Sequence, residues 1–389
     1  MKKLLYGTTA LATAGIVAGI AADASAAERL KLGLGGYHQQ WVVFSNQDID
    51  GLEPNNYNSV DQKHNSEVCF IGETTLDNNL TFGVNVQLEA NTDGDQIDES
   101  FMYVSSPTMG RLILGDENNA GYLTHVTAPD GGVSLDSGDL LNIEAFVIPV
   151  AGVFDTAIGT TYLRFFDNDS GKITYLTPRF AGLQVGASYI PNFEAGGDDN
   201  SALRSCVRCN GFSNGWAGGA NYTADLGGVG LQASAGAMWG DAAAGPDTDN
   251  LFAWSLGGQA SIAGFSAGFG FAKGEQGRGG TSGRTTAAGA EVSSIQINST
   301  GWTVGAAYEI GPYKVGVDYY RGVGNPNSSA GTADTSGRQR LDQAVLSGTY
   351  TLGPGIRLVG GVFWFDGESE GNTVENDGYG VATGFKLGF

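Results

Sequence analysis

The sequence predicts an all-β protein, a 16-stranded antiparallel β-barrel that spans a membrane. Three observations lead to this prediction. Segments of about ten residues alternate apolar and polar side chains, which is the period of a strand with two different faces. The connections between segments are alternately short and long, and Trp and Tyr gather near segment ends on the apolar side, as at Trp254 and Tyr308. Aromatic girdles of this kind are typical of barrels that cross both interfaces of a membrane.

The first 26 residues have the layout of a cleaved export signal. Two lysines lie near the start, an apolar run covers residues 4–22, and the small triplet Ala-Ser-Ala at 24–26 provides a cleavage site. Gly and Ala dilute the apolar run, which favours a signal over a membrane anchor. We therefore expect residues 1–26 to be removed on export and residues 27–389 to form a single barrel domain.

The composition narrows the class of partner. The chain carries 20 Lys and Arg against 41 Asp and Glu, a formal net charge of −21, so it repels nucleic acid and anionic membrane surfaces. Glycine makes up 63 of the 389 residues, about 16%, where about 7% is usual. Since neither a G-x-y period nor abundant proline accompanies it, we expect glycine to serve strands and turns.

The predicted strands follow one another along the mature chain. The first segment places Leu30, Leu32 and Leu34 on one face, and residues 80–89 give the strictest alternation. Comparable segments lie near residues 183–189, 252–262, 265–271, 302–310, 313–319, 344–352 and 356–364. The last segment, residues 377–389, repeats the pattern and ends on an aromatic ring with no polar tail.

The connections have two lengths. The short ones are at 77–79, 107–110, 181–182, 227–228, 263–264, 311–312 and 353–355. The long ones are at 46–64, 92–97, 117–160, 192–214, 243–249, 275–299, 325–338 and 367–376. Seven short and eight long connections join sixteen strands, and we expect short periplasmic turns and long outer loops.

Closure of the barrel follows from the chemistry of the membrane. No segment after the signal has helical periodicity, and in hydrocarbon each backbone group must find a partner within the protein. We therefore expect residues 377–389 to pair with the first strand. Sixteen strands enclose a space too wide for side chains to fill, so the lumen holds water. We expect inward glycines of the last strand to keep the lumen open; they are Gly378, Gly380, Gly384 and Gly388.

The cysteines and histidines do not indicate a metal site. Cys206 and Cys209 form a C-x-x-C pair, and because an exported chain meets an oxidising compartment we take them as a disulfide candidate. Cys69 lies on the lumen side of its strand by alternation. The acidic residues 92–100 leave loose calcium binding open beside the simpler interpretation of solvated loops. We predict no metal site and no other cofactor.

These features resemble the Gram-negative general diffusion porins, in particular the alphaproteobacterial group. The resemblance covers the whole mature chain, and a local match lies in YLTPRFAG, where Tyr175, Pro178, Phe180 and Gly182 follow the family's strand and turn. It implies a water-filled channel for passive diffusion of ions and small hydrophilic solutes, in the outer membrane of a Gram-negative bacterium.

The resemblance also implies partners for the barrel. A homotrimer is expected, in contact with outer-membrane lipid and lipopolysaccharide. The closing residues Phe385, Leu387 and Phe389 resemble the family's signal for the barrel insertion machinery.

The same resemblance implies that the third long loop, residues 117–160, folds into the barrel and narrows it. Its acidic residues would form one side of the constriction; they are Asp130, Asp136, Asp139, Glu144 and Asp155. Basic residues of the wall would face them; they are Arg29, Lys31, Arg111, Arg164, Lys172, Lys314 and Arg357. Opposed rows of charge create a transverse field that sorts solutes by size and sign.

Two other classes of function compete with a channel. A barrel plugged by its third loop would serve ligand binding or adhesion through its outer loops. An outer-membrane hydrolase is disfavoured, because the G-x-S-x-G stretch at 211–215 precedes a strand and has no histidine partner. We therefore predict that the chain is not an enzyme.

Overall fold

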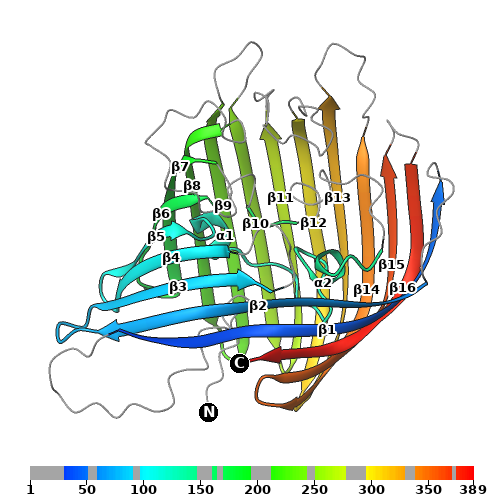
Figure 1. Ribbon diagram of the computed structural model, residues 1–389, viewed down its shortest axis with the longest axis horizontal. Helices are drawn as coiled ribbons and strands as arrows, with labels where there is room; N and C mark the ends of the chain where they lie inside the picture. The colour runs from blue at the N-terminus through cyan, green and yellow to red at the C-terminus, as the bar shows by residue number, and fades with distance from the viewer. Residues whose placement is uncertain are drawn as a thin grey trace.

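The computed structural model describes residues 30–50, 59–90, 97–146, 160–163, 170–193, 212–242, 250–276, 295–328, 338–369 and 374–389. Its sixteen strands form one closed antiparallel barrel, in which each strand pairs with its neighbours in the sequence and β1 pairs with β16 (Figure 1). The predicted fold class is confirmed.

The elements have the following bounds. The strands are β1 Lys31–Asp50, β2 Val60–Thr75, β3 Thr81–Glu89, β4 Ile97–Ser106, β5 Gly110–Asp116, β6 Gly171–Leu176, β7 Leu183–Asn192, β8 Phe212–Asp225, β9 Val229–Ala242, β10 Leu251–Ile262, β11 Phe265–Gln276, β12 Ile295–Ile310, β13 Tyr313–Ser328, β14 Gln339–Gly353, β15 Ile356–Ser369 and β16 Val374–Gly388. Two short helices, α1 Ala120–Leu123 and α2 Asp139–Asn142, lie in the third long connection. Within the described ranges, neither helix has the length and apolar character needed to cross a bilayer.

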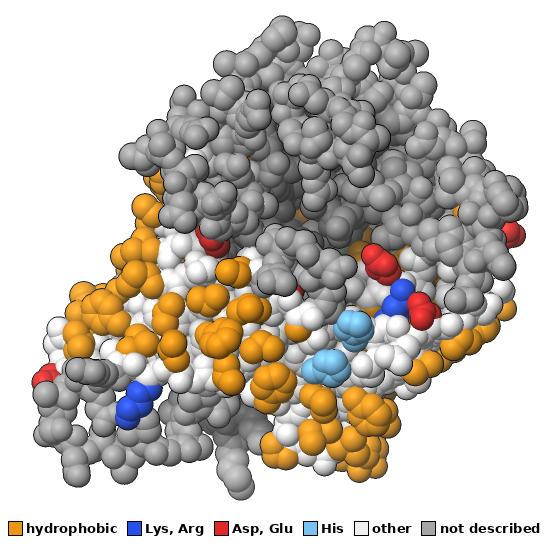
Figure 2. Space-filling view, viewed as in Figure 1, with side chains coloured by type: hydrophobic (Ala, Val, Ile, Leu, Met, Phe, Trp, Pro, Cys, Tyr) orange, Lys and Arg blue, Asp and Glu red, His pale blue; other side chains and the backbone are white. Residues whose placement is uncertain are grey.

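The apolar side chains at alternate positions face outward, as predicted. Four such side chains on four different strands are between 43% and 54% exposed; they are Val185, Val304, Val317 and Leu346. Figure 2 shows apolar side chains in broad patches on the outer surface of the barrel. Such exposure would be unfavourable in water, whereas on a transmembrane barrel these side chains contact lipid.

Aromatic side chains pair across neighbouring strands near both ends of the barrel. The rings of Tyr189 and Trp216 lie 4.9 Å apart close to the outer ends of β7 and β8. Beside a short turn at the other end, the rings of Tyr313 and Tyr350 stack 5.0 Å apart. The two groups of aromatic rings fit the predicted girdles at the two membrane interfaces.

The last strand closes the barrel against the first. The pairing of β1 with β16 runs from Tyr37 opposite Gly388 to Asp50 opposite Glu375. The terminal residue takes part, because Phe389 and Gly36 exchange backbone hydrogen bonds of 3.0 and 3.1 Å. The prediction that the C-terminal segment pairs with the first strand is confirmed.

The short connections lie where they were predicted, but several long ones have different limits. β1 continues to Asp50 and β2 begins at Val60, inside the predicted loop 46–64. Outside the membrane both faces of a strand meet water, so the side chains lose their alternation and the sequence gives no strand signal. The third connection is longer than predicted, because β6 begins at Gly171 and not soon after residue 160.

Three of the four inward glycines of β16 have a different role from the one expected, whereas a β-carbon at Gly388 would meet nothing within 4 Å. A β-carbon at Gly378 would lie 2.9 Å from the ring of Phe365, and one at Gly380 would overlap the ring of Phe363. A β-carbon at Gly384 would lie 3.0 Å from the ring of Trp41. These glycines therefore make room for buried aromatic rings and do not leave this part of the lumen open.

Candidate pore constriction

The third long connection follows the inside of the barrel wall. α1 packs against β6 to β9, and the backbone N–H of Ala120 donates to Ser188 Oγ at 2.8 Å. Farther along, the hydroxyl of Thr349 on β14 donates to the carbonyl of Gly131 at 2.8 Å. Figure 1 shows α1 and α2 within the outline of the barrel. The predicted infolding of this loop is confirmed.

Glycines on four strands of the wall let the loop lie flat against it. A β-carbon at Gly257 would overlap the carbonyl oxygen of Val126, and one at Gly316 would lie 2.6 Å from the backbone nitrogen of Gly131. We call the inward glycines that touch the loop in this way the glycine track; they are Gly219, Gly257, Gly305 and Gly316, on β8, β10, β12 and β13. Much of the high glycine content on this side serves this close approach of two backbones.

α2 is anchored to the wall by a buried ion pair. Nζ of Lys386, on β16, lies 2.7 Å from both carboxylate oxygens of Asp139. The backbone N–H and hydroxyl of Ser134 also donate to Asp139, at 2.9 and 3.1 Å. Asp139 is 6% exposed. The expectation that Asp139 lines the open constriction is therefore wrong, because burial against Lys386 removes its carboxylate from the lumen.

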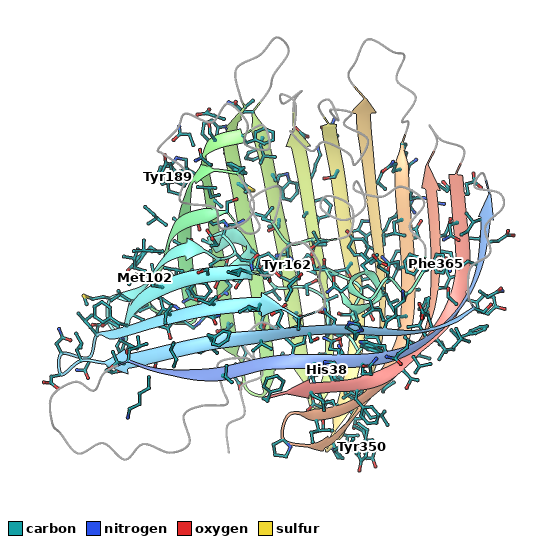
Figure 3. The ribbon with its side chains drawn as sticks, viewed as in Figure 1. His38, Met102, Tyr162, Tyr189, Tyr350 and Phe365 are labelled. Carbon is teal, nitrogen blue, oxygen red and sulfur yellow. The ribbon has the colours of Figure 1, made fainter. Side chains whose placement is uncertain are left out.

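Apolar side chains complete this anchor. Four apolar side chains of the loop are buried in one cluster with inward side chains of the wall; they are Leu135, Leu140, Ile143 and Phe146. The ring of Phe146 stacks on that of Phe365 with centroids 4.0 Å apart and planes 8° apart. Phe365 is labelled in Figure 3. Burial of these side chains stabilises the loop in its seat by the ordinary hydrophobic effect.

Asp136 ties two parts of the loop together. Its carboxylate accepts hydrogen bonds from the hydroxyls of Thr127 and Thr161 and one of 2.6 Å from the backbone N–H of Thr161. Nε2 of His125 lies 2.9 Å from the same threonine hydroxyl. Asp136 is partly exposed and has a structural role inside the loop, and its place on an acidic pore face stays a prediction.

His125 makes the loop sensitive to acid. Burial lowers the pKa of His125 to about 4, although the nearby Asp136 carboxylate acts in the opposite direction. In an opened loop a histidine titrates near 6.5, so between about pH 6.5 and pH 4 the open form takes up a proton that the closed form does not. The closed loop therefore loses stability as the pH falls through this range, by on the order of 3 kcal/mol at its acid end.

We expect hydrogen exchange of the amides of residues 120–136, corrected for the intrinsic rate, to be faster at pH 5 than at pH 7. His125→Gln keeps a side chain whose amide can reach the hydroxyl of Thr161, as Nε2 of the histidine does, but it does not titrate, so it should flatten this pH dependence. An equal pH response in both proteins would assign the effect to another group.

The remaining predicted acids have different surroundings. Asp130 accepts a hydrogen bond of 2.7 Å from the backbone N–H of Gly132 and lies 3.7 Å from Nζ of Lys314, so the structure brings one predicted pair together. Glu144 has a left-handed backbone, with φ of 47°, and an exposed side chain. Asp155 lies outside the described residues.

The predicted basic residues are scattered over the wall. Lys31 is exposed at the start of β1, and Lys172 is buried and donates to the carbonyl of Ser170 at 2.7 Å. The guanidinium of Arg111 lies 3.9 Å from the centre of the Tyr103 ring. The other predicted members are placed as follows: Arg357 is half-buried opposite Lys386, while Arg29 and Arg164 lie outside the described residues, as do Cys206 and Cys209. Cys69 is buried on the lumen side, as predicted.

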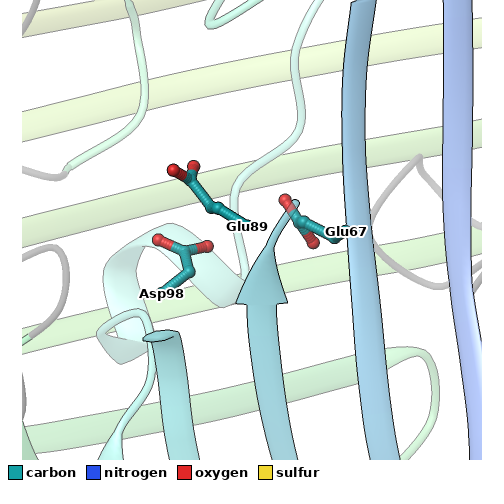
Figure 4. Close-up of side chains that lie close together, drawn as sticks. All are labelled: Glu67, Glu89 and Asp98. Carbon is teal, nitrogen blue, oxygen red and sulfur yellow. The ribbon is translucent and has the colours of Figure 1, made fainter. Parts of the chain in front are cut away.

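A cluster of carboxylates on β2, β3 and β4 was not predicted. Glu67, Glu89 and Asp98 each offer an oxygen within 4.8 Å of the other two, and all three side chains are partly exposed (Figure 4). Glu67 shares its face of β2 with the buried Cys69, so the acidic cluster projects toward the lumen. The hydroxyl of Tyr37 donates to Glu67 at 2.7 Å.

Only Asp98 of this acidic cluster belonged to an acidic stretch that the sequence singled out. Glu67 and Glu89 are isolated in the sequence and become opposite neighbours through the register of β2 with β3. Lys386 was overlooked for the same reason, since the residue it binds lies 247 positions earlier in the chain.

Comparison of the sequence with known protein families gives one match. A sequence model of the family described as Gram-negative porin matches residues 7–385 of the chain. No curated protein matches the chain in sequence.

Solved structures share the fold at low identity. An anion-selective porin from Comamonas acidovorans is 16% identical, with a TM-score of 0.55 over 92% of this chain and 100% of that chain. The trimer form of OmpT, an outer membrane protein of Vibrio cholerae, is 13% identical, with a TM-score of 0.54 over 94% of this chain and 100% of that one. The outer membrane channel DcaP of Acinetobacter baumannii is 13% identical, with a TM-score of 0.57 over 92% and 97%. At these identities the likeness concerns the fold alone.

Proposed function

We propose that this chain, which belongs to the Gram-negative porin family, is a channel that prefers cations. It is a porin of the outer membrane and forms a water-filled channel for passive diffusion of ions and small hydrophilic solutes. The preference for cations rests on one observation, the acidic cluster of Glu67, Glu89 and Asp98 on the inner wall.

The position of the acidic cluster supports this role. The glycine track and α2 lie along β8 to β16, whereas the acidic cluster lies on β2 to β4, so solutes pass between the loop and the carboxylates. Three like charges this close lower the potential around them and concentrate mobile cations. Asp130 and Asp139 contribute less to this field, because Lys314 and Lys386 lie beside them.

Neutralising the acidic cluster should reduce the cation preference. The test uses the triple variant Glu67→Gln/Glu89→Gln/Asp98→Asn. We expect its cation-to-anion permeability ratio to fall about fivefold or more, because each unit charge at contact distance contributes about 1 kcal/mol even in water. The ratio is measured from the reversal potential across a salt gradient in a planar bilayer.

A matched control removes three charges from the outer face. Asp48, Glu375 and Asp377 are exposed on the outward faces of β1 and β16. Neutralising all three changes the net charge equally and should leave the reversal potential unchanged. If both triple variants shift it alike, selectivity depends on total charge, and the acidic cluster has no special role.

A plugged barrel used for ligand binding or adhesion is the second candidate function. It predicts electrical silence when micromolar protein is added to a planar bilayer, where the channel predicts a large ohmic conductance. The glycine track favours the channel over the plugged barrel, because it holds the third loop along the wall and not across the lumen.

We further propose a homotrimer that contacts outer-membrane lipid and lipopolysaccharide, needs no cofactor or metal and catalyses no reaction. A trimer form among the similar structures supports the assembly. Phe385, Leu387 and Phe389 are 48%, 37% and 62% exposed on the outer face, where insertion machinery can read them. The mass of the detergent-solubilised protein tests the trimer.

A further inference from the structure

Two further carboxyl groups, those of Glu99 and Glu117, meet on the wall beside the acidic cluster. Glu99 on β4 follows Asp98 of that cluster in the chain (Figure 4), and Glu117 is the first residue of the third long connection. One amide contacts both groups, since Nδ2 of Asn118 lies 2.7 Å from Oε1 of Glu99 and 3.5 Å from Oε1 of Glu117. Glu99 is buried and Glu117 is partly buried. We call these two residues the carboxyl pair.

A hydrogen bond joins the two members of the carboxyl pair directly. An ionised carboxylate can only accept hydrogen bonds, so two carboxyl groups can be joined in this way only if one of them keeps its proton. The carboxyl pair then carries one negative charge instead of two. In a partly buried place this arrangement also avoids two like charges in contact.

The surrounding donors favour Glu117 as the group that keeps the proton. Both oxygens of Glu99 accept from amides, Oε2 from Nε2 of Gln87 at 2.5 Å and Oε1 from Nδ2 of Asn118, and such donors favour the ionised form. In Glu117, Oε1 accepts from the backbone N–H of Asn118 at 2.8 Å, which leaves Oε2 to donate to Glu99. Within the part of the chain that the structure describes, the buried Oδ1 of Asn118 has no hydrogen-bond partner, so the amide is oriented by its contacts with the carboxyl pair.

Burial and neighbouring charges act on the carboxyl pair in opposite directions. Burial raises the pKa of Glu117, whereas its hydrogen bonds and the nearby Arg111 act to lower it, and the pKa is raised on balance. Charged or titratable side chains adjoin the carboxyl pair on five strands; they are Glu67 and Cys69 on β2, Glu89 on β3, Asp98 on β4, Arg111 and Asp116 on β5, and Lys172 on β6.

We propose that Glu99 and Glu117 share one proton at neutral pH and that this proton makes the cation preference of the channel depend on pH. In mildly alkaline solution the proton passes to the solvent, the carboxyl pair gains its second negative charge, and the wall beside the acidic cluster attracts cations more strongly. The inference rests on the proposed cation preference and adds Glu117 to the residues that determine it.

Reversal potentials at two pH values test the shared proton. Between about pH 6 and about pH 9, above the range in which ordinary carboxyl groups titrate, we expect the cation-to-anion permeability ratio to rise about two- to fivefold, the effect of one added unit charge within several ångströms of a passing ion. Cys69→Ser is present in every protein compared, because the thiol on the same wall can also ionise in alkaline solution.

Glu117→Gln is the matched variant. Its amide can donate to Glu99 in place of the shared proton, so the carboxyl pair keeps one negative charge but has no proton to lose. We expect the same permeability ratio as in the unsubstituted channel at pH 6 and no rise toward pH 9. A lower ratio at pH 6 would show that Glu117 is already ionised, and an equal rise would assign the titration to another group; either result would overturn the proposal.

Infrared spectroscopy gives a second measurement that does not need the variant. The carbonyl stretch of a protonated carboxyl group should be present in the channel at pH 6 and should lose intensity toward pH 9. A spectrum that does not change over this range would overturn the proposal. The proposed function is tested separately at pH 6 by the triple variant of the acidic cluster, so a channel that keeps its cation preference but has no pH response refutes the shared proton alone.

Discussion

Replacement of Lys386 by methionine is expected to free α2 from the wall and to make the channel close intermittently. The substitution leaves the carboxylate of Asp139 buried without its cation, and breaking a buried pair in this way costs about 3–5 kcal/mol. Ser134 still donates to Asp139, and Phe146 still stacks on Phe365, so the loop remains tethered but samples the lumen. Single-channel recordings should show added current noise and brief closures.

The double variant Asp139→Asn/Lys386→Met is the matched control for this prediction. It removes both charges, so no uncompensated carboxylate remains buried, and the quiet conductance should largely return. Both proteins must first form heat-resistant folded barrels, which separates loop release from misfolding. A quiet, unaltered current in Lys386→Met alone would show that the apolar contacts hold the loop without the ion pair.

Gly257→Ala is expected to lower the single-channel conductance. A methyl group at this position cannot coexist with the present path of the loop, because it would overlap the carbonyl oxygen of Val126. Either the loop moves into the lumen or the wall deforms, and overpacking of this kind costs about 1–3 kcal/mol. Gly257→Val should have a larger effect in the same direction.

An outward glycine provides the comparison. Gly218 lies on β8, and a β-carbon there would meet its nearest atom at 3.7 Å, which is ordinary contact. Gly218→Ala makes the same exchange of glycine for alanine within a strand, and it should leave the conductance unchanged. If Gly257→Ala and Gly218→Ala have the same single-channel conductance, the glycine track does not control the width of the channel.

The acidic residues of the third loop show how far sequence analysis of the site reaches. The resemblance to the porin family correctly implied that this loop lies inside the barrel, but it did not show which carboxylates face water. Asp136 bonds to Thr127 and Thr161, and Asp139 is buried against Lys386, because the loop has a hydrophobic seat that only its folded path defines. The carboxylates that are brought together on the wall come instead from Glu67, Glu89 and Asp98.

The barrel can be predicted from the sequence alone, including its strand number, its apolar exterior and the pairing of its two ends. The period of two is local, and the requirement that lipid imposes holds for every backbone group wherever it lies in the chain, so neither depends on which particular side chains meet. Which charges meet and where the loop lies become known from the folded structure. Those contacts depend on strand register and on loop packing between residues far apart in the sequence, such as Asp139 and Lys386 at a separation of 247, and no local pattern encodes them.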